Sequence, residues 1–171
     1  MSLKPFLILG IGNLLRTDDG VGVHVVNLLN DSGKLPDFAE AVDAETSGLD
    51  LPSLLQGRER VIVVDALEAE EEEPGSIFRF DARRLSSSAP HAVSLHETGI
   101  VEALRALEVL GEKPETEIIG IVPHDAESMG IEPTEPVLAA IPKVLRLVFQ
   151  AVSDYQKSDS GIAIGEDAPL Q

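Results

Sequence analysis

Two carboxylates and one imidazole stand where side chains in α/β proteins commonly do chemistry. Asp19 follows an apolar run and a glycine turn, Asp65 ends the run Arg60–Asp65, and His96 lies in the first turn of a predicted helix. Carboxylate oxygens and an imidazole nitrogen suit a hard or borderline divalent cation and leave coordination positions for a substrate. A helix N-terminus favours the neutral imidazole that binds metal. These residue types predict an open metal site.

Each of these residues also has a purely structural interpretation. Asp19 or its neighbour Asp18 could cap the helix that begins near Gly20. Asp65 could cap whatever follows its strand, and His96 could be a surface residue of its helix. The sequence spacing alone leaves both interpretations open.

The sequence argues against other common kinds of site. The motif Gly10-x-Gly12 after a strand is typical of dinucleotide binding, but Leu15 stands where the third glycine belongs. Asp18 and Asp19 would also repel the phosphates. Cysteine is absent and no serine lies in a G-x-S-x-G elbow, so no nucleophilic side chain is indicated.

Composition predicts one acidic, globular domain. The chain has 171 residues and a formal net charge of −17, which disfavours nucleic acid and anionic membranes as partners. No apolar run approaches the length of a membrane span, and the lack of cysteine fits a reducing, cytoplasmic location. We expect one domain over residues 1–154 and a polar, flexible tail over 155–171.

Alternating elements predict an α/β fold of three layers. The apolar runs are continuous, as in a mostly parallel sheet with helices on both faces. Helices are expected at 20–30, at 49–55, after the capping-box motif Ser94–Glu97, and at 134–155. Strands are expected at 5–12, 38–44, 60–65, 76–80 and 115–122.

Four motifs, in this order, closely resemble the hydrogenase maturation endopeptidases, and the match covers about the first 150 residues. The motifs are Gly10–Gly22, Asp43–Gly48, Val63–Ala66 and Ser94–Gly99. The resemblance implies a five-stranded twisted sheet of the phosphorylase/hydrolase-like kind. It also implies an endopeptidase that removes a C-terminal extension from a nickel-iron hydrogenase large-subunit precursor once nickel, carried by the precursor, is in place.

The resemblance assigns roles to particular residues. The metal-binding and catalytic positions of the family fall on Asp19, Asp65 and His96. Further candidates for substrate contact or for support of the ligands are Asn13, Asp18, Asp43 and His124. His124 follows the strand 115–122 and should reach the same edge of the sheet. Ala44-Glu45 replaces a glycine pair common in the family, which affects substrate fit at Asp43.

Two other functions are compatible with parts of the sequence. A nickel carrier or assembly chaperone for the same precursor would use the same ligands without cutting the chain. A peptidyl-tRNA hydrolase would share the opening Gly-x-Gly-Asn turn, but its following proline and later histidine-asparagine pair are absent here. The charge of −17 also opposes tRNA binding. Motif order and coverage favour the endopeptidase. The sequence leaves the oligomeric state open.

Overall fold

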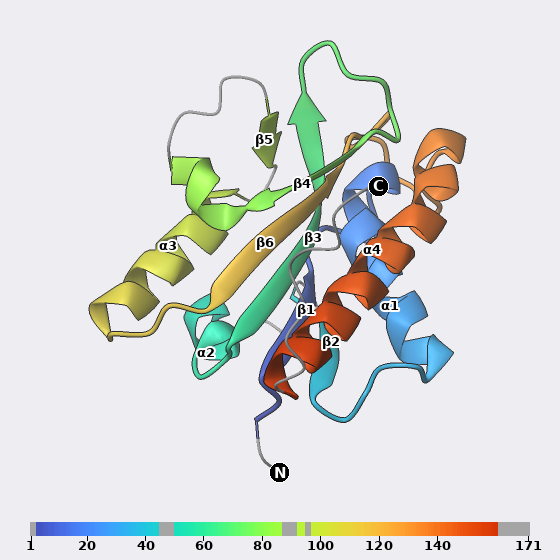
Figure 1. Cartoon of the computed structure of the whole chain (residues 1–171). Coiled ribbons are helices and arrows are strands. Elements are labelled where there is room, and N and C mark those ends of the chain that lie inside the picture. Colours follow the sequence, from blue (N-terminus) through green and yellow to red (C-terminus); the bar gives the residue numbers. More distant parts are fainter. Residues whose placement is uncertain (1–2, 45–49, 87–91, 95–96, 161–171) are drawn as a thin grey trace, which may run out of the picture.

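The computed structural model describes residues 3–44, 50–86, 92–94 and 97–160. Its main sheet has five strands in the order β2-β1-β3-β6-β4 (Figure 1). Strands β2, β1, β3 and β6 run parallel, and β4 lies antiparallel at the edge beside β6. The predicted five-stranded, mostly parallel α/β sheet is therefore confirmed. The strands are β1 Phe6–Gly10, β2 Ala39–Asp43, β3 Arg60–Ala69, β4 Ile77–Asp81 and β6 Glu115–Ile121.

Helices cover both faces of the sheet (Figure 1). One face carries α1 (Val21–Ser32) and α4 (Glu135–Asp159), and the other carries α2 (Leu51–Leu55) and α3 (Glu97–Val109). Short 3-10 helices precede α1 and follow β4, as η1 (Thr17–Gly20) and η2 (Ala82–Ser86). The expected three-layer arrangement is present.

Side chains that alternate along the inner strand β1 contribute to two separate cores. Phe6 and Ile8 pack into the core beneath α1 and α4, whereas Leu7 and Leu9 pack into the core beneath α2 and α3. Successive side chains of a strand point to opposite faces, so a strand covered on both faces must be apolar throughout. Every residue of β1 is buried, as this arrangement requires.

Strand β3 is longer than the pattern Arg60–Asp65 predicts. It continues to Ala69 because its outer end pairs antiparallel with a short strand, β5 (Ala92–Ser94), which the sequence analysis did not predict. Leu67 lies opposite Ser94 in this pairing. Because the polar residue Glu68 interrupts the apolar run, the sequence pattern does not predict this extension.

Helix α4 also runs further than predicted. It ends at Asp159, so residues 155–159, which were expected to belong to the polar tail, are helical. Tyr155 explains the extension, because its ring packs 5.3 Å from that of Phe6 and 5.5 Å from that of Phe38, measured between ring centroids. The rest of the expected tail, residues 161–171, lies outside the described residues.

By length and mean hydropathy, α4 is the one helix among the described residues that could cross a membrane. Here it packs as a core helix, with the apolar stripe from Val137 to Val152 buried against the sheet. Charged residues such as Lys143 and Arg146 occupy its exposed side. A buried stripe beside a charged face is the pattern of a helix on the surface of a globular domain.

Candidate active site

The carboxyl ends of the parallel strands meet at one edge of the sheet, which we call the carboxyl edge. In register, Asp43 of β2 lies beside Gly10 of β1, and Gly10 lies beside Val64 of β3. Asp65 is the next residue of β3. The turn and η1 that carry Asp19 follow β1 directly and contact β3. Three of the carboxylates that the sequence singled out therefore share this edge, where ligands bind in open α/β sheets.

Glycines in the first motif allow α1 to start directly against the strands. A Cβ atom at Gly22 would lie 2.2 Å from the carbonyl oxygen of Val64, and one at Gly10 would lie 2.3 Å from that of Gly22. Gly12 has a φ of 132°, and a Cβ there would lie 1.8 Å from the carbonyl oxygen of Asp19. The glycines thus allow close backbone packing around Asp19.

Asp19 is a nearly buried carboxylate with spare acceptor capacity. Its side chain sits in η1 with a relative exposure of 6%, and Oδ2 accepts a hydrogen bond of 3.1 Å from the Asn13 backbone N–H. Within the described part of the chain, Oδ1 has no hydrogen-bond partner. An ionised carboxylate oxygen accepts donors or a cation, so this oxygen is suited to an external cation or donor.

The interpretation of Asp18 or Asp19 as a helix cap is wrong. The N-cap of α1 is Gly20, with no side-chain capping bond. Asp18 is fully buried and its carboxylate instead reaches the loop between β6 and α4. It accepts hydrogen bonds from the backbone N–H groups of His124, Asp125 and Thr134 and from the Thr134 hydroxyl, over 2.6–2.8 Å.

Asp65 lies inside β3 with a relative exposure of 1%. Since the strand continues to Ala69, Asp65 does not cap a following segment. His96, the third predicted ligand, lies outside the described residues. Across residues 3–44, 50–86, 92–94 and 97–160, no group of three His, Asp, Glu or Cys side chains is placed to hold a metal ion.

The other candidate residues surround this edge in different ways. The Asn13 side chain accepts a 2.9 Å hydrogen bond from the Leu15 N–H, which fixes the turn that also presents the Asn13 N–H to Asp19. Asp43 ends β2, and the next residue, Ala44, donates its N–H to the Gly10 carbonyl over 3.0 Å. The loop between β6 and α4 carries an exposed His124 side chain near its start.

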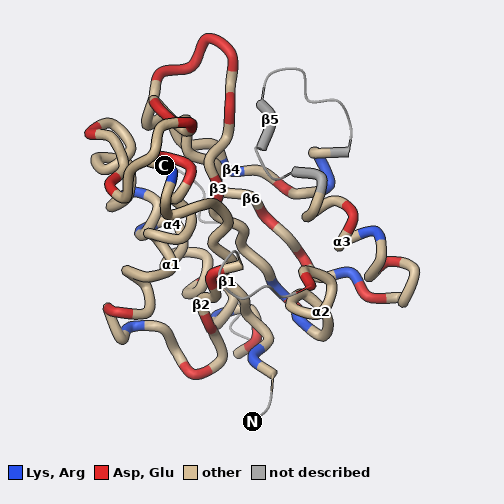
Figure 2. The backbone as a smooth tube through the Cα atoms, turned by 180° about the vertical axis from the view of Figure 1, so that it is seen from behind, with Lys and Arg blue, Asp and Glu red and all other residues tan. Residues whose placement is uncertain are grey.

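A cavity of about 590 Å³ opens between the β3–β4 loop and the β6–α4 loop. Its acidic lining includes Glu68, Glu70 and Glu72 on one side and Asp125 and Glu127 on the other. The acidic run of the β3–β4 loop stands out in Figure 2. The pKa of Asp125 is lowered by hydrogen bonds from the Ser128 side chain and backbone and from the Glu127 N–H. This side of the molecule thus presents negative charge to an approaching substrate.

Thr134 contributes to this region although its sequence pattern predicts only the start of a helix. Thr134 is the N-cap residue of α4, but its hydroxyl donates to Asp18 and makes no capping bond. The partners are 116 residues apart in the sequence, so no local pattern could pair them.

The comparisons with known proteins agree on one family. A family model described as hydrogenase maturation protease matches residues 23–151. The hydrogenase 2 maturation protease of Escherichia coli is 31% identical over 147 residues, covering 82% of this chain and 90% of that protein. The hydrogenase expression/formation protein HoxM of Azotobacter vinelandii is 35% identical, covering 90% of this chain and 75% of its own.

Solved structures give the same result. The hydrogenase maturating endopeptidase HybD from E. coli superposes with a TM-score of 0.77 at 30% identity, covering 88% of this chain and 93% of its own. The NiFe hydrogenase maturation protease HybD from Thermococcus kodakarensis superposes with a TM-score of 0.73 at 26% identity, covering 86% and 98%. The likeness extends over nearly the whole of both chains.

Proposed function

This chain belongs to the hydrogenase maturation protease family and is an endopeptidase, and from that premise we propose its substrate and the residues that act on it. The substrate is the large-subunit precursor of a nickel-iron hydrogenase. The enzyme removes the C-terminal extension of this precursor after nickel has been inserted. The observation that carries the proposal is the nearly buried Asp19 carboxylate, at the edge that also holds Asp65. One oxygen of this carboxylate has no partner among the residues that the structure describes.

The metal-recognising ligands in this proposal are Asp19, Asp65 and His96. Two carboxylates and an imidazole suit a borderline divalent ion such as nickel, which arrives with the substrate. The pairing of β5 supports the assignment of His96, because Ser94 pairs with Leu67, which lies only two residues from Asp65 in β3. His96 follows Ser94 by two residues, and two residues span at most roughly 7 Å.

The proposed chemistry depends on the absence of cysteine from the sequence and on the acidic residues at the carboxyl edge. With no cysteine and no G-x-S-x-G serine elbow in the sequence, peptide hydrolysis needs an activated water. A divalent ion can polarise the scissile carbonyl or acidify a bound water. Asp19 and Asp65 orient the loaded precursor, so cleavage depends on prior nickel insertion. Asp43 ends β2, the strand that pairs with β1, and in this proposal it contacts the substrate segment.

The surroundings fit a soluble protein partner. The acidic cavity beside the carboxyl edge disfavours nucleic acid and anionic lipid. The absence of cysteine fits a reducing compartment, and we place the reaction in the cytoplasm.

The deciding experiment mixes the purified protein with nickel-loaded and nickel-free precursor and weighs the products by mass spectrometry. We expect shortening of the nickel-loaded precursor alone. Equal trimming of both forms would remove the dependence on nickel. An unchanged precursor mass together with stoichiometric nickel binding would identify a carrier in place of a protease.

A further inference from the structure

The β6–α4 loop, residues 122–134, is held in place by polar contacts more than by apolar packing. Among its residues only Val122 and Pro133 are buried. Its first half lines the acidic cavity at the carboxyl edge. The conformation of this loop therefore depends on the hydrogen bonds that attach it to the rest of the molecule.

Those hydrogen bonds lead to the turn that carries Asp19. The Gly130 N–H donates to the Leu15 carbonyl over 3.0 Å, and the Thr17 hydroxyl donates to the Ser128 carbonyl over 2.7 Å. A β-bridge between Arg16 and Met129 joins the same two segments. The turn and the loop are thus linked at several points along their length.

Asp18 makes most of the hydrogen bonds between the turn and the loop. Its carboxylate accepts two N–H groups at the start of the loop, from His124 and Asp125, and both donors of Thr134 at the end of the loop. The Asp18 N–H also donates to the Asp125 carbonyl over 3.0 Å. One side chain therefore closes both ends of the loop onto the residue that precedes Asp19.

We propose that Asp18 is a positioning residue for precursor cleavage, clasping the β6–α4 loop to the Asp19 turn so that the cavity wall and the metal-recognising carboxylate keep one fixed arrangement. The inference rests on the proposed function. Hydrogen bonds to an ionised acceptor are strong and directional, so four donors on one buried carboxylate fix geometry as well as stability. No residue of the loop itself belongs to either apolar core.

The test compares Thr134→Val with Thr134→Ser. Valine keeps the shape but removes the hydroxyl donor, whereas serine keeps the donor. We expect kcat/KM for the nickel-loaded precursor to fall about tenfold in the valine variant, the size expected for one hydrogen bond to a charged group. Thr134→Ser should retain wild-type activity. Backbone amides of residues 124–130 should exchange hydrogen faster in the valine variant only.

A core variant separates positioning from general stability. Val148→Ala removes buried volume from α4, far from the loop, and should lower the melting temperature without lowering kcat/KM at temperatures well below melting. Asp18→Asn, if it folds, should be impaired more than Thr134→Val, because the amide nitrogen cannot accept the donors.

The outcomes distinguish the two proposals. If the wild-type protein cleaves the precursor while Thr134→Val shows unchanged kcat/KM and unchanged amide exchange, the clasp is overturned and the proposed function stands. If the wild-type protein does not cleave, the proposed function fails. The amide exchange of Thr134→Val then decides whether the clasp holds the loop.

Discussion

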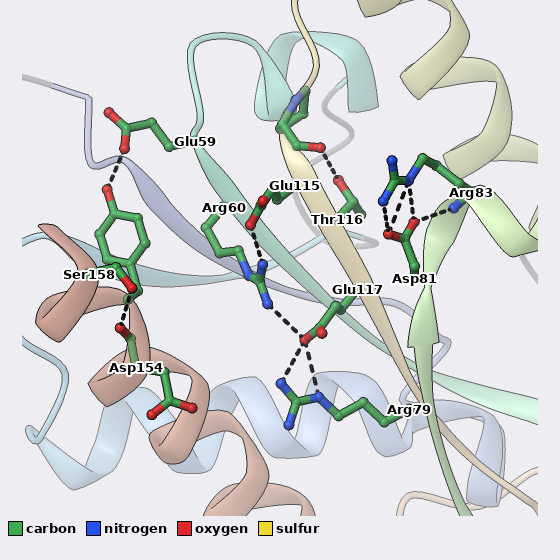
Figure 3. A network of polar contacts seen from close by, with 12 residues as sticks. Glu59, Arg60, Arg79, Asp81, Arg83, Glu115, Thr116, Glu117, Asp154 and Ser158 are labelled. Carbon is green, nitrogen blue, oxygen red and sulfur yellow. Dashed lines mark hydrogen bonds and ion pairs between the residues drawn. The ribbon is translucent and has the colours of Figure 1, made fainter. Parts of the chain in front are cut away.

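The two edges of the sheet handle charge in opposite ways. At the amino edge, where the parallel strands begin, Arg60 pairs with Glu115 and Glu117, and Arg79 also pairs with Glu117 (Figure 3). The relative exposure of these side chains ranges from 22% to 76%. At the carboxyl edge, the Asp18 and Asp19 carboxylates are buried, and their partners in the described part of the chain are N–H and O–H groups.

The exposed ion pairs and the buried carboxylates differ in what they contribute to the molecule. Solvated ion pairs contribute little to stability and tolerate change. Buried carboxylates without a countercharge are costly unless hydrogen bonds or a ligand satisfy them. Among the described residues, four donors reach the Asp18 carboxylate, whereas one reaches that of Asp19. The contrast supports the proposal that Asp19 binds a group of the substrate.

The largest expected effect is that of Asp19→Asn on activity. Asparagine keeps the shape and can still accept the Asn13 N–H, but it loses the charge that binds a cation. We expect kcat/KM for the precursor to fall at least about a hundredfold, with little change in melting temperature. Mass spectrometry and thermal unfolding measure both quantities. Glu117→Gln at the amino edge is the matched control, and full activity of Asp19→Asn would end its assignment as a ligand.

Gly22→Ala tests the close backbone approach that builds the carboxyl edge. The added methyl group would lie 2.2 Å from the Val64 carbonyl oxygen and 2.4 Å from that of Ile11. We expect a loss of about 3 kcal/mol in the free energy of unfolding, measured by denaturant titration.

The control for this variant is Gly33→Ala, at the end of α1. Gly33 has a φ of 62° and no atom near its would-be Cβ, so only backbone strain of about 1 kcal/mol applies. Equal losses in the two variants would contradict the close-packing explanation.

The ion-pair network at the amino edge should contribute less to the free energy of unfolding than the close packing at Gly22. Glu117→Gln leaves Arg60 and Arg79 without their shared carboxylate. We expect a loss of at most about 1 kcal/mol in unfolding free energy, shrinking further as salt is added. Precursor cleavage should be unchanged. A large loss of activity would mean that the amino edge takes part in the reaction.

The smallest effect concerns the single tyrosine of the chain, Tyr155. Burial first, and then its hydrogen bond to Glu59, raise the pKa of Tyr155 to about 12. Its stabilising contribution is therefore complete below the unfolded pKa of about 10 and is lost as the pH rises towards 12. Ultraviolet titration of the phenol should show this late midpoint. Glu59→Gln should lower the midpoint, and an ordinary midpoint in the wild-type protein would contradict the packing of Tyr155.

Local sequence patterns determined the fold class and the carboxylates of the candidate site. The apolar run Phe6–Gly10 must be a buried strand because all its side chains avoid water. Asp19 and Asp65 could be predicted to share one edge, because Asp19 follows β1 and Asp65 lies near the end of the parallel pairing of β3 with β6. The range of β3 could not be predicted past Asp65, because its last residues depend on pairing with β5.

Tertiary structure alone decided how two adjacent aspartates divide their roles. The sequence presents Asp18 and Asp19 as equivalent acids before a helix. Asp18 takes its donors from residues more than a hundred positions away, while Asp19 faces the nearby Asn13 and keeps one oxygen without a partner in the described chain. Hydrophobic periodicity is local and can be read along the chain, but the partners of a buried charge come from whichever segments the fold brings beside it.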